Sequence, residues 1–284
     1  FSTVVLRGNA GNDSLTGTDM DDALVGGEGG DVLNGGWGAD RILIGEATPV
    51  TDTVVIGADG ESSPNFTDTV FGFDTLGTTG NDVLSLPSAV IAADSAGWVD
   101  GAQNNGAIQS HSIGAGGMVT FGNADAGGTP VLINGTNIGN AVVYLGQNIT
   151  AVGQAMAFEV DMDSNGSVDS LYVFQKSGNP DNFGNDVMVH LRGVVGATLG
   201  TTQGQNIVQL VDTTGPTVSN ATLTANGLTL QANEIVSTVD LAGLSLQQGN
   251  GATLTAMTPS GLPGVSGTVV TITTGTTLGA NDYV

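Results

Sequence analysis

The chain contains no cysteine in 284 residues, which excludes disulfide bonds and thiolate chemistry. Basic residues are almost as scarce, because 4 Lys and Arg stand against 27 Asp and Glu, for a formal net charge of -23. Such an acidic chain is a poor partner for nucleic acid or an anionic membrane surface and a good partner for divalent cations. No apolar run approaches the roughly 20 residues of a membrane span, so none is predicted.

Aromatic residues and processing signals are also sparse. Aromatic side chains make up 5 % of the chain, and Trp37 and Trp98 lie in unrelated segments, which argues against an aromatic platform for carbohydrate binding. The chain begins at Phe1 without an initiating Met and without a charged and apolar signal peptide. We therefore expect a processed chain or a piece of a longer protein, and the repeats described below, which start so close to Phe1, favour the piece.

Motifs of common hydrolases are missing from the sequence. There is no H-E-x-x-H zinc motif and no G-x-S-x-G nucleophile elbow. The two histidines, His111 and His190, are far apart and have no companion motif, so we interpret both as structural. Carboxylates are abundant, but cation binding explains those with a regular spacing, so the spacing does not indicate a catalytic pair of carboxylates. The sequence therefore predicts a protein that is not an enzyme.

Glycine and aspartate, in contrast, recur with a fixed period. Residues 8–43 read as four consecutive nonapeptides, GNAGNDSLT, GTDMDDALV, GGEGGDVLN and GGWGADRIL. This is the G-G-x-G-x-D-x-U-x pattern of a parallel β-roll that binds calcium. Every repeat has Gly at position one, Asp at position six and an aliphatic residue at position eight. The aspartates are Asp13, Asp22, Asp31 and Asp40.

The period predicts how these residues come together. Because each coil of a roll takes two nonapeptides, turns 18 residues apart stack at strand spacing, roughly 4.8 Å. Asp13 and Asp31 then belong to one stack and Asp22 and Asp40 to the other. Carbonyl oxygens of the glycine turns would complete each site, as a hard divalent ion prefers. The predicted calcium ligands of the roll are these four aspartates with Gly8, Gly27, Gly29, Gly36 and Gly38.

Residues 8–43 resemble the RTX (repeats-in-toxin) family. The resemblance implies an extracellular bacterial protein that is exported unfolded by a type I secretion channel and folded outside the cell by calcium. Three positions depart from the pattern. Asn9 in the first repeat and Thr18 in the second replace the Gly at position two, and Met20 replaces the Gly at position four of the second repeat. Asp19 and Asp21 are either extra ligands in this irregular coil or solvated acids.

The segments that follow are predicted to be mainly strands. DTVVIG, DTVFGFDTL and GNDVLSL alternate apolar residues with Asp and Gly, and they resemble the capping segment of RTX proteins, so residues 47–96 are predicted to cap the roll at residues 1–46. Residues 97–200 are predicted to form a β-rich domain. One short helix is expected over residues 138–149, and strands are expected over residues 158–160, 171–174 and 187–191.

A second calcium site is predicted within residues 97–200. The segment from Asp161 to Asp169 matches the D-x-D-x-N-G-x-x-D opening of an EF-hand loop, in which Gly166 allows the sharp turn. Position twelve of such a loop holds Tyr172 instead of Glu, and the flanks read as strands, so we predict a calcium-binding β-hairpin in preference to a plain polar turn. The predicted ligands are Asp161, Asp163, Asn165, Ser167 and Asp169. Similar hairpins occur in RTX proteins.

The last part of the chain has the pattern of a separate module. Residues 201–211 are predicted to be a linker. Residues 212–284 show Gly- and Asn-rich turns between short strands, as in an immunoglobulin-like sandwich, and the strands are predicted over residues 218–223, 228–230, 241–246 and 269–273. This segment resembles repeats of large bacterial surface proteins. It is shorter than the roughly 100 residues of a complete sandwich, so we expect a missing strand and hypothesise that another chain completes the open edge.

Two classes of function are compatible with these features. We predict a calcium-dependent extracellular structural or adhesive protein, such as a surface-layer, filament or adhesin segment on the bacterial surface, with calcium and other copies of itself or neighbouring surface modules as partners. The alternative is the non-catalytic C-terminal region of a secreted RTX enzyme of the protease, lipase or epimerase type. The trailing module favours the first class.

Overall fold

The computed structural model describes residues 3–57, 61–75, 80–86, 89–94, 97–125, 127–176 and 185–201, and from there on the backbone of further strands. The chain divides into two compact units, residues 1–213 and 214–284. Strands dominate both units, as the sequence predicts.

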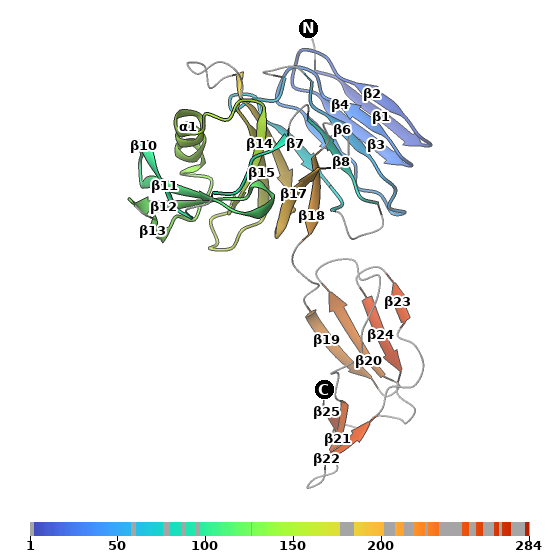
Figure 1. Ribbon diagram of the computed structural model, residues 1–284. Coiled ribbons are helices and arrows are strands. Elements are labelled where there is room, and N and C mark those ends of the chain that lie inside the picture. The colour runs from blue at the N-terminus through green and yellow to red at the C-terminus, as the bar shows by residue number, and fades with distance from the viewer. Residues whose placement is uncertain are drawn as a thin grey trace. The chain divides into compact units, whose positions relative to one another are not determined.

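The first unit begins with two parallel sheets that wind as a roll (Figure 1). One sheet starts with β1 (Val5–Ala10), β3 (Ala23–Glu28) and β5 (Arg41–Leu43), and the other with β2 (Ser14–Thr16) and β4 (Val32–Asn34). Val5 lies beside Ala23 and Ala23 beside Arg41, so stacked strands are offset by 18 residues, as two nonapeptides per coil predict. The aliphatic residue at position eight of each repeat points between the two sheets.

The roll extends past the four nonapeptides. β6 (Thr53–Val55), β7 (Asp68–Phe71) and β8 (Val83–Ser85) pair in parallel with β4, β5 and β6 and continue the same two sheets. The predicted capping segment, residues 47–96, therefore contributes further coils. Its coils are longer, because the hydrogen bonds that stack them join residues 21, 28 and 30 apart, and this lengthening hides the period in the sequence.

One sheet runs without interruption from the roll into the rest of the unit. β7 pairs with β16 (Val187–Arg192), which is followed by β15 (Ser170–Gln175), β14 (Gln154–Val160) and β9 (Ala89–Val90), giving eight strands. Core residues of the roll, such as Leu24 and Ile42, belong to the same cluster as Leu171 and Val189. The roll and the segment predicted as a separate domain thus share one core.

A second layer covers the outer face of β14, β15 and β16. It consists of α1 (Ile138–Asn148) and a four-stranded antiparallel sheet with a 3-10 turn at Ala115–Gly117. The helix lies where the sequence predicts it and buries Tyr144 and Leu145 against a second core. The strands of this sheet are β10 (Val99–Asn105), β11 (Ile108–Ile113), β12 (Val119–Ala124) and β13 (Gly127–Pro130).

The predicted linker at residues 201–211 is wrong in part. β17 (Ala197–Thr201) and β18 (Val208–Asp212) form an antiparallel pair, and β18 also pairs with β8, so residues 208–211 belong to the second roll sheet. Backbone pairing with an existing sheet edge satisfies hydrogen bonds that a free linker would leave to water.

The second unit has two small sheets. β19 (Val218–Thr224), β20 (Gly227–Ala232), β24 (Val269–Thr273) and β23 (Gly264–Ser266) form one, and β22 (Leu254–Met257), β21 (Leu246–Gly249) and β25 (Asp282–Tyr283) form the other. Three of the predicted strands coincide with β19, β20 and β24, whereas most of the strand predicted over residues 241–246 lies outside the described residues. The immunoglobulin-like assignment and the open edge stay predictions.

The alternation within β5 predicts opposite outcomes for two adjacent substitutions. Ile42 is fully buried in the shared core, and Leu43 is 36 % exposed on the outer face. Ile42→Ala should destabilise the protein by about 2 to 5 kcal/mol, whereas Leu43→Ala should change stability by less than about 0.5 kcal/mol. Denaturant unfolding in the presence of calcium measures both, and equal effects would contradict the assignment of the two faces.

Candidate calcium centres

Seven aspartates stand at the starts of the roll strands and form two columns. In each step of a column, the backbone N–H of one aspartate donates a hydrogen bond of 2.7 to 2.9 Å to Oδ1 of the aspartate in the next coil. Six of the seven side chains are buried, and Asp13 at the end of the roll is half-buried. One column holds Asp13, Asp31, Asp52 and Asp82, and the other holds Asp22, Asp40 and Asp68.

The second carboxylate oxygen has no partner in three of the four repeats. Oδ2 of Asp13, Asp31 and Asp40 is buried and accepts no hydrogen bond. Burial of an unpaired charged oxygen costs several kcal/mol unless a cation compensates it. A divalent cation such as calcium favours carboxylate oxygens of this kind, so the residues present fit the ion.

The glycine turns leave no room for side chains beside these oxygens. A Cβ on Gly8 would collide with the carbonyl oxygen of Gly26 and with the Asp13 carboxylate. Gly27, Gly29, Gly36 and Gly38 have φ between 89° and 131°, and a Cβ on any of them would press on the backbone of the turn one coil earlier. The predicted glycine positions thus let successive turns stack backbone to backbone, which brings carbonyl oxygens close to the aspartate columns.

The irregular second repeat satisfies its aspartate differently. The N–H and Oγ1 of Thr18 donate to Oδ2 of Asp22 at 2.6 and 2.8 Å, and the N–H of Val4 donates to Oδ1 at 2.7 Å. Burial acts to raise the pKa of Asp22, but these hydrogen bonds outweigh it and the net shift is downward. Asp19 and Asp21 are exposed, and Oδ1 of Asp21 accepts a hydrogen bond from the N–H of Ala39.

Comparison with known families agrees with this geometry. A model of the RTX calcium-binding nonapeptide repeat matches the chain in four copies, over residues 5–19 and 16–46. Residues 5–46 are RTX calcium-binding repeats. The RTX repeats bind Ca²⁺ and are typical of secreted proteins. No match to the chain is found among curated proteins.

Three aspartates of the RTX roll escape sequence reasoning, namely Asp52, Asp68 and Asp82. Each occupies the same place in its column as the aspartates of the repeats. The signal was present, because every one of the seven lies two residues before an aliphatic side chain that packs in the core of the roll, as Asp52 does before Val54 and Asp68 before Val70. The lengthened turns conceal it, since a search for a nine-residue period stops at residue 43.

Stacking of buried carboxylates raises the pKa values of the aspartates in the later coils. Burial, assisted by neighbouring carboxylates, raises the pKa of Asp40 to about 6, of Asp52 to about 7, of Asp68 to about 8 and of Asp82 to about 7. Without a cation, Asp68 therefore favours the protonated form at neutral pH, Asp52 and Asp82 are partly protonated, and Asp40 becomes protonated in mild acid.

The predicted second site forms the turn of a β-hairpin. β14 and β15 are antiparallel neighbours, and the loop between them brings ligand oxygens of Asp161, Asp163 and Asp169 within 4.8 Å of one another. The N–H groups of Asn165 and Gly166 donate to the Asp161 carboxylate, at 3.1 and 2.8 Å. Asp161 is buried, whereas Asp163 is exposed.

Two of the predicted hairpin ligands are engaged within the loop. Nδ2 of Asn165 donates to Asp163 at 2.9 Å, and the N–H of Ser167 donates to Oδ1 of Asn165 at 2.8 Å. The three aspartates thus converge, and Asn165 and Ser167 order the backbone between them. Calcium binding by this loop stays a prediction.

Both histidines are buried in the core of the first unit. The ring of His190 stacks on Tyr172 with 4.5 Å between centroids, and Nε2 hydrogen-bonds with Oγ of Ser170 at 3.0 Å. Burial and the charge of Arg192 lower the pKa of His190 to about 4. Nδ1 of His111 hydrogen-bonds with the Tyr144 hydroxyl at 3.0 Å, and burial lowers its pKa. These contacts fit the structural role that the sequence predicts.

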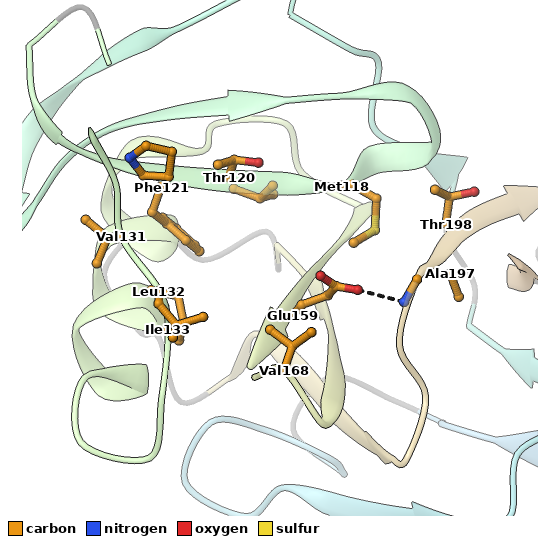
Figure 2. Close-up of a pocket in the computed structure, with 13 residues that line it drawn as sticks. Met118, Thr120, Phe121, Val131, Leu132, Ile133, Glu159, Val168, Ala197 and Thr198 are labelled. Atoms are coloured by element: carbon orange, nitrogen blue, oxygen red, sulfur yellow. Dashed lines mark hydrogen bonds between the residues drawn. The ribbon is translucent and has the colours of Figure 1, made fainter. Parts of the chain in front are cut away.

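A pocket lies between β12, residues 130–133 and β14 (Figure 2). Its lining is largely apolar, and Glu159 is the one titratable side chain among the lining residues that the structure describes. Oε1 of Glu159 accepts a hydrogen bond of 2.7 Å from the N–H of Gly196. In the described part of the chain, no helix has the length and apolar character needed to cross a bilayer.

The raised aspartate pKa values predict an unusual pH dependence for the calcium-free protein. The folded state binds more protons than the unfolded state between about pH 4 and pH 8, so stability falls as pH rises through this range. Thermal melting in chelator should give a lower Tm at pH 8 than at pH 5. Saturating calcium should remove this fall, because the ions bind the deprotonated carboxylates. A Tm that is independent of pH in chelator would contradict the prediction.

The hairpin predicts a calcium defect separable from the roll. Asp163→Ala removes an exposed carboxylate from the cluster, so calorimetric titration should lose about one calcium site while the roll keeps its ions. Asp125→Ala, an exposed aspartate beyond the end of β12, is the matched control and should keep every site. If Asp163→Ala keeps the full stoichiometry, residues 161–169 form only a polar turn.

Proposed function

We propose that this chain is a calcium-dependent extracellular structural or adhesive protein of the bacterial surface. In this role, calcium bound along the aspartate columns of the RTX roll holds the chain in a rigid β-rich form after export. The work of the protein is contact and assembly, and it carries out no catalysis.

One observation supports this proposal above the others. The unpaired oxygens of Asp31 and Asp40 lie in a roll whose sheet continues, through β7 and β16, as far as the predicted calcium hairpin. An ion that compensates the roll therefore stabilises the strands that carry most of the first unit. Coupling of calcium to so much of the chain suits a protein that must stay unfolded in a low-calcium interior and become rigid outside.

The contact between the two predicted calcium regions is built from side chains. Oγ of Ser170 donates to Asp169 of the hairpin at 2.7 Å, His190 hydrogen-bonds with Ser170, and Nδ1 of His190 lies 3.5 Å from Oγ1 of Thr69. Thr69 follows Asp68, the last aspartate of its column. This path of side-chain hydrogen bonds favours a common response of roll and hairpin to calcium.

The second unit also supports an assembly role. Its described strands form two small sheets of four and three strands. The sequence of this unit resembles the repeated β-modules of large bacterial surface proteins. The alternative function is a non-catalytic region of a secreted RTX enzyme. Such an enzyme would also contain the roll, but it would carry a catalytic domain on the same polypeptide and would be released into the medium.

Fractionation of the cells that produce the protein tests the proposal. We expect the native protein in the cell-surface fraction in calcium and its release by chelator, because loss of the ions leaves unpaired buried carboxylates and destabilises the roll. Asp31→Asn with Asp40→Asn should weaken surface retention, whereas Asp125→Asn should not. Recovery of the protein only from the medium, together with a hydrolase or epimerase activity on the same polypeptide, would favour the secreted enzyme.

A further inference from the structure

Three of the four basic side chains of this acidic chain share one face of a sheet. Of the four, Lys176 is buried and forms an ion pair with Asp186 at 3.2 Å. The three arginines are all exposed, on β1, β5 and β16 of the eight-stranded sheet. They share its outer face, because the alternate residues Leu6, Ile42 and Leu191 point into the core.

This outer face combines positive charge with apolar surface. Val5 is 59 % exposed and Leu43 36 % exposed, and the outward positions of β1, β3, β5 and β7 carry no Asp or Glu. The Arg41 and Arg192 guanidinium groups lie 4.8 and 5.6 Å from the centroid of the Phe71 ring. We name this surface the arginine face; it comprises Val5, Arg7, Arg41, Leu43, Phe71 and Arg192.

The Phe71 ring orders Arg41 and Arg192 before any partner arrives. A guanidinium stacked on an aromatic face keeps its N–H groups available for a carboxylate, often as a two-pronged pair. Since the side chains are already held, less rotamer freedom is lost on binding. The face therefore fits an acidic partner with apolar side chains beside its carboxylates.

A surface with that composition lies on the turns of the same roll. Trp37 is 49 % exposed and Met20 41 % exposed, next to the exposed carboxylates of Asp19 and Asp21. The two turns are stacked, because the N–H of Trp37 donates to the carbonyl of Thr18 at 3.0 Å and the N–H of Ala39 donates to Asp21. We name these four residues the tryptophan turn.

We propose that the tryptophan turn of one copy docks on the arginine face of a second copy. The inference names the partner for the assembly role proposed above and rests on it. Each surface supplies what the other lacks, since carboxylates meet guanidinium groups and Trp37 and Met20 meet Leu43 and Val5. Tryptophan and arginine are also the side chains that most often dominate the energy of protein interfaces.

The geometry determines the kind of assembly. The two surfaces are different parts of the molecule, so the contact is heterologous, and each docked copy still offers one free surface of each kind. Such contacts build chains of molecules. These contacts also require calcium. Both segments of the tryptophan turn belong to the stacked turns of the RTX roll, which calcium is proposed to stabilise.

Two variants, each with one surface removed, test the contact in the full chain. Arg41→Glu with Arg192→Glu reverses the arginine face, and Met20→Ser with Trp37→Ser removes the apolar part of the tryptophan turn. In calcium, light scattering should show species larger than a dimer for the natural sequence and the 28.2 kDa monomer for each variant. An equimolar mixture of the two variants should give dimers that grow no further, because one intact surface of each kind remains.

Controls separate this contact from folding and from the proposed function. Both variants should keep the calcium stoichiometry and circular dichroism of the natural sequence, and Asp125→Arg should assemble normally. A monomeric natural chain in calcium, or a mixture that stays monomeric, would overturn the inference while leaving calcium-dependent surface retention intact. Binding of an anionic polysaccharide by a monomeric chain, lost in the arginine variant alone, would replace the second copy with a polyanion.

Discussion

The backbone N–H of one aspartate and the carboxylate of the next coil form the contact on which the roll depends. This hydrogen bond fixes the stacking of the turns, and it also places carboxylates above one another in a partly dry environment. The same interaction that sets the architecture thus creates the electrostatic problem. A bound cation would compensate these carboxylates, since Oδ2 of Asp31 and Asp40 has no other partner, so calcium binding would stabilise the folded roll.

The continuous sheet spreads this dependence through the first unit. β7 pairs with β5 of the roll on one side and with β16 on the other. Strands more than 100 residues apart in sequence therefore share one hydrogen-bonded sheet. The core follows the same path from Leu24 to Val189. A loss of the ions in the roll therefore removes support from β14, β15 and β16, and the second layer with α1 rests on those strands.

Acidic and basic residues lie on separate parts of the fold, which the net charge of -23 does not show. The aspartates of the columns lie at the strand starts, where bound cations would compensate them, and three of the four basic residues are exposed on the outer face of the eight-stranded sheet. The natural calcium partner and the proposed protein partner thus use separate surfaces. Phe71 and Trp37, two of the few aromatic residues, mark the arginine face and the tryptophan turn.

The sequence by itself determined the repeat, the offset of 18 residues, the places of Asp13, Asp31 and Asp40 in the two columns, the helix that begins at residue 138 and the hairpin at residues 161–169. These features are local or strictly periodic, so neighbours along the chain specify them. Only the tertiary structure decided that Asp52, Asp68 and Asp82 extend the columns, that Thr18 satisfies Asp22, that β18 joins a roll sheet and that three arginines share one face. Those outcomes depend on which strands become neighbours across loops of unequal length, and strand pairing over such distances is set by the closing of a common core.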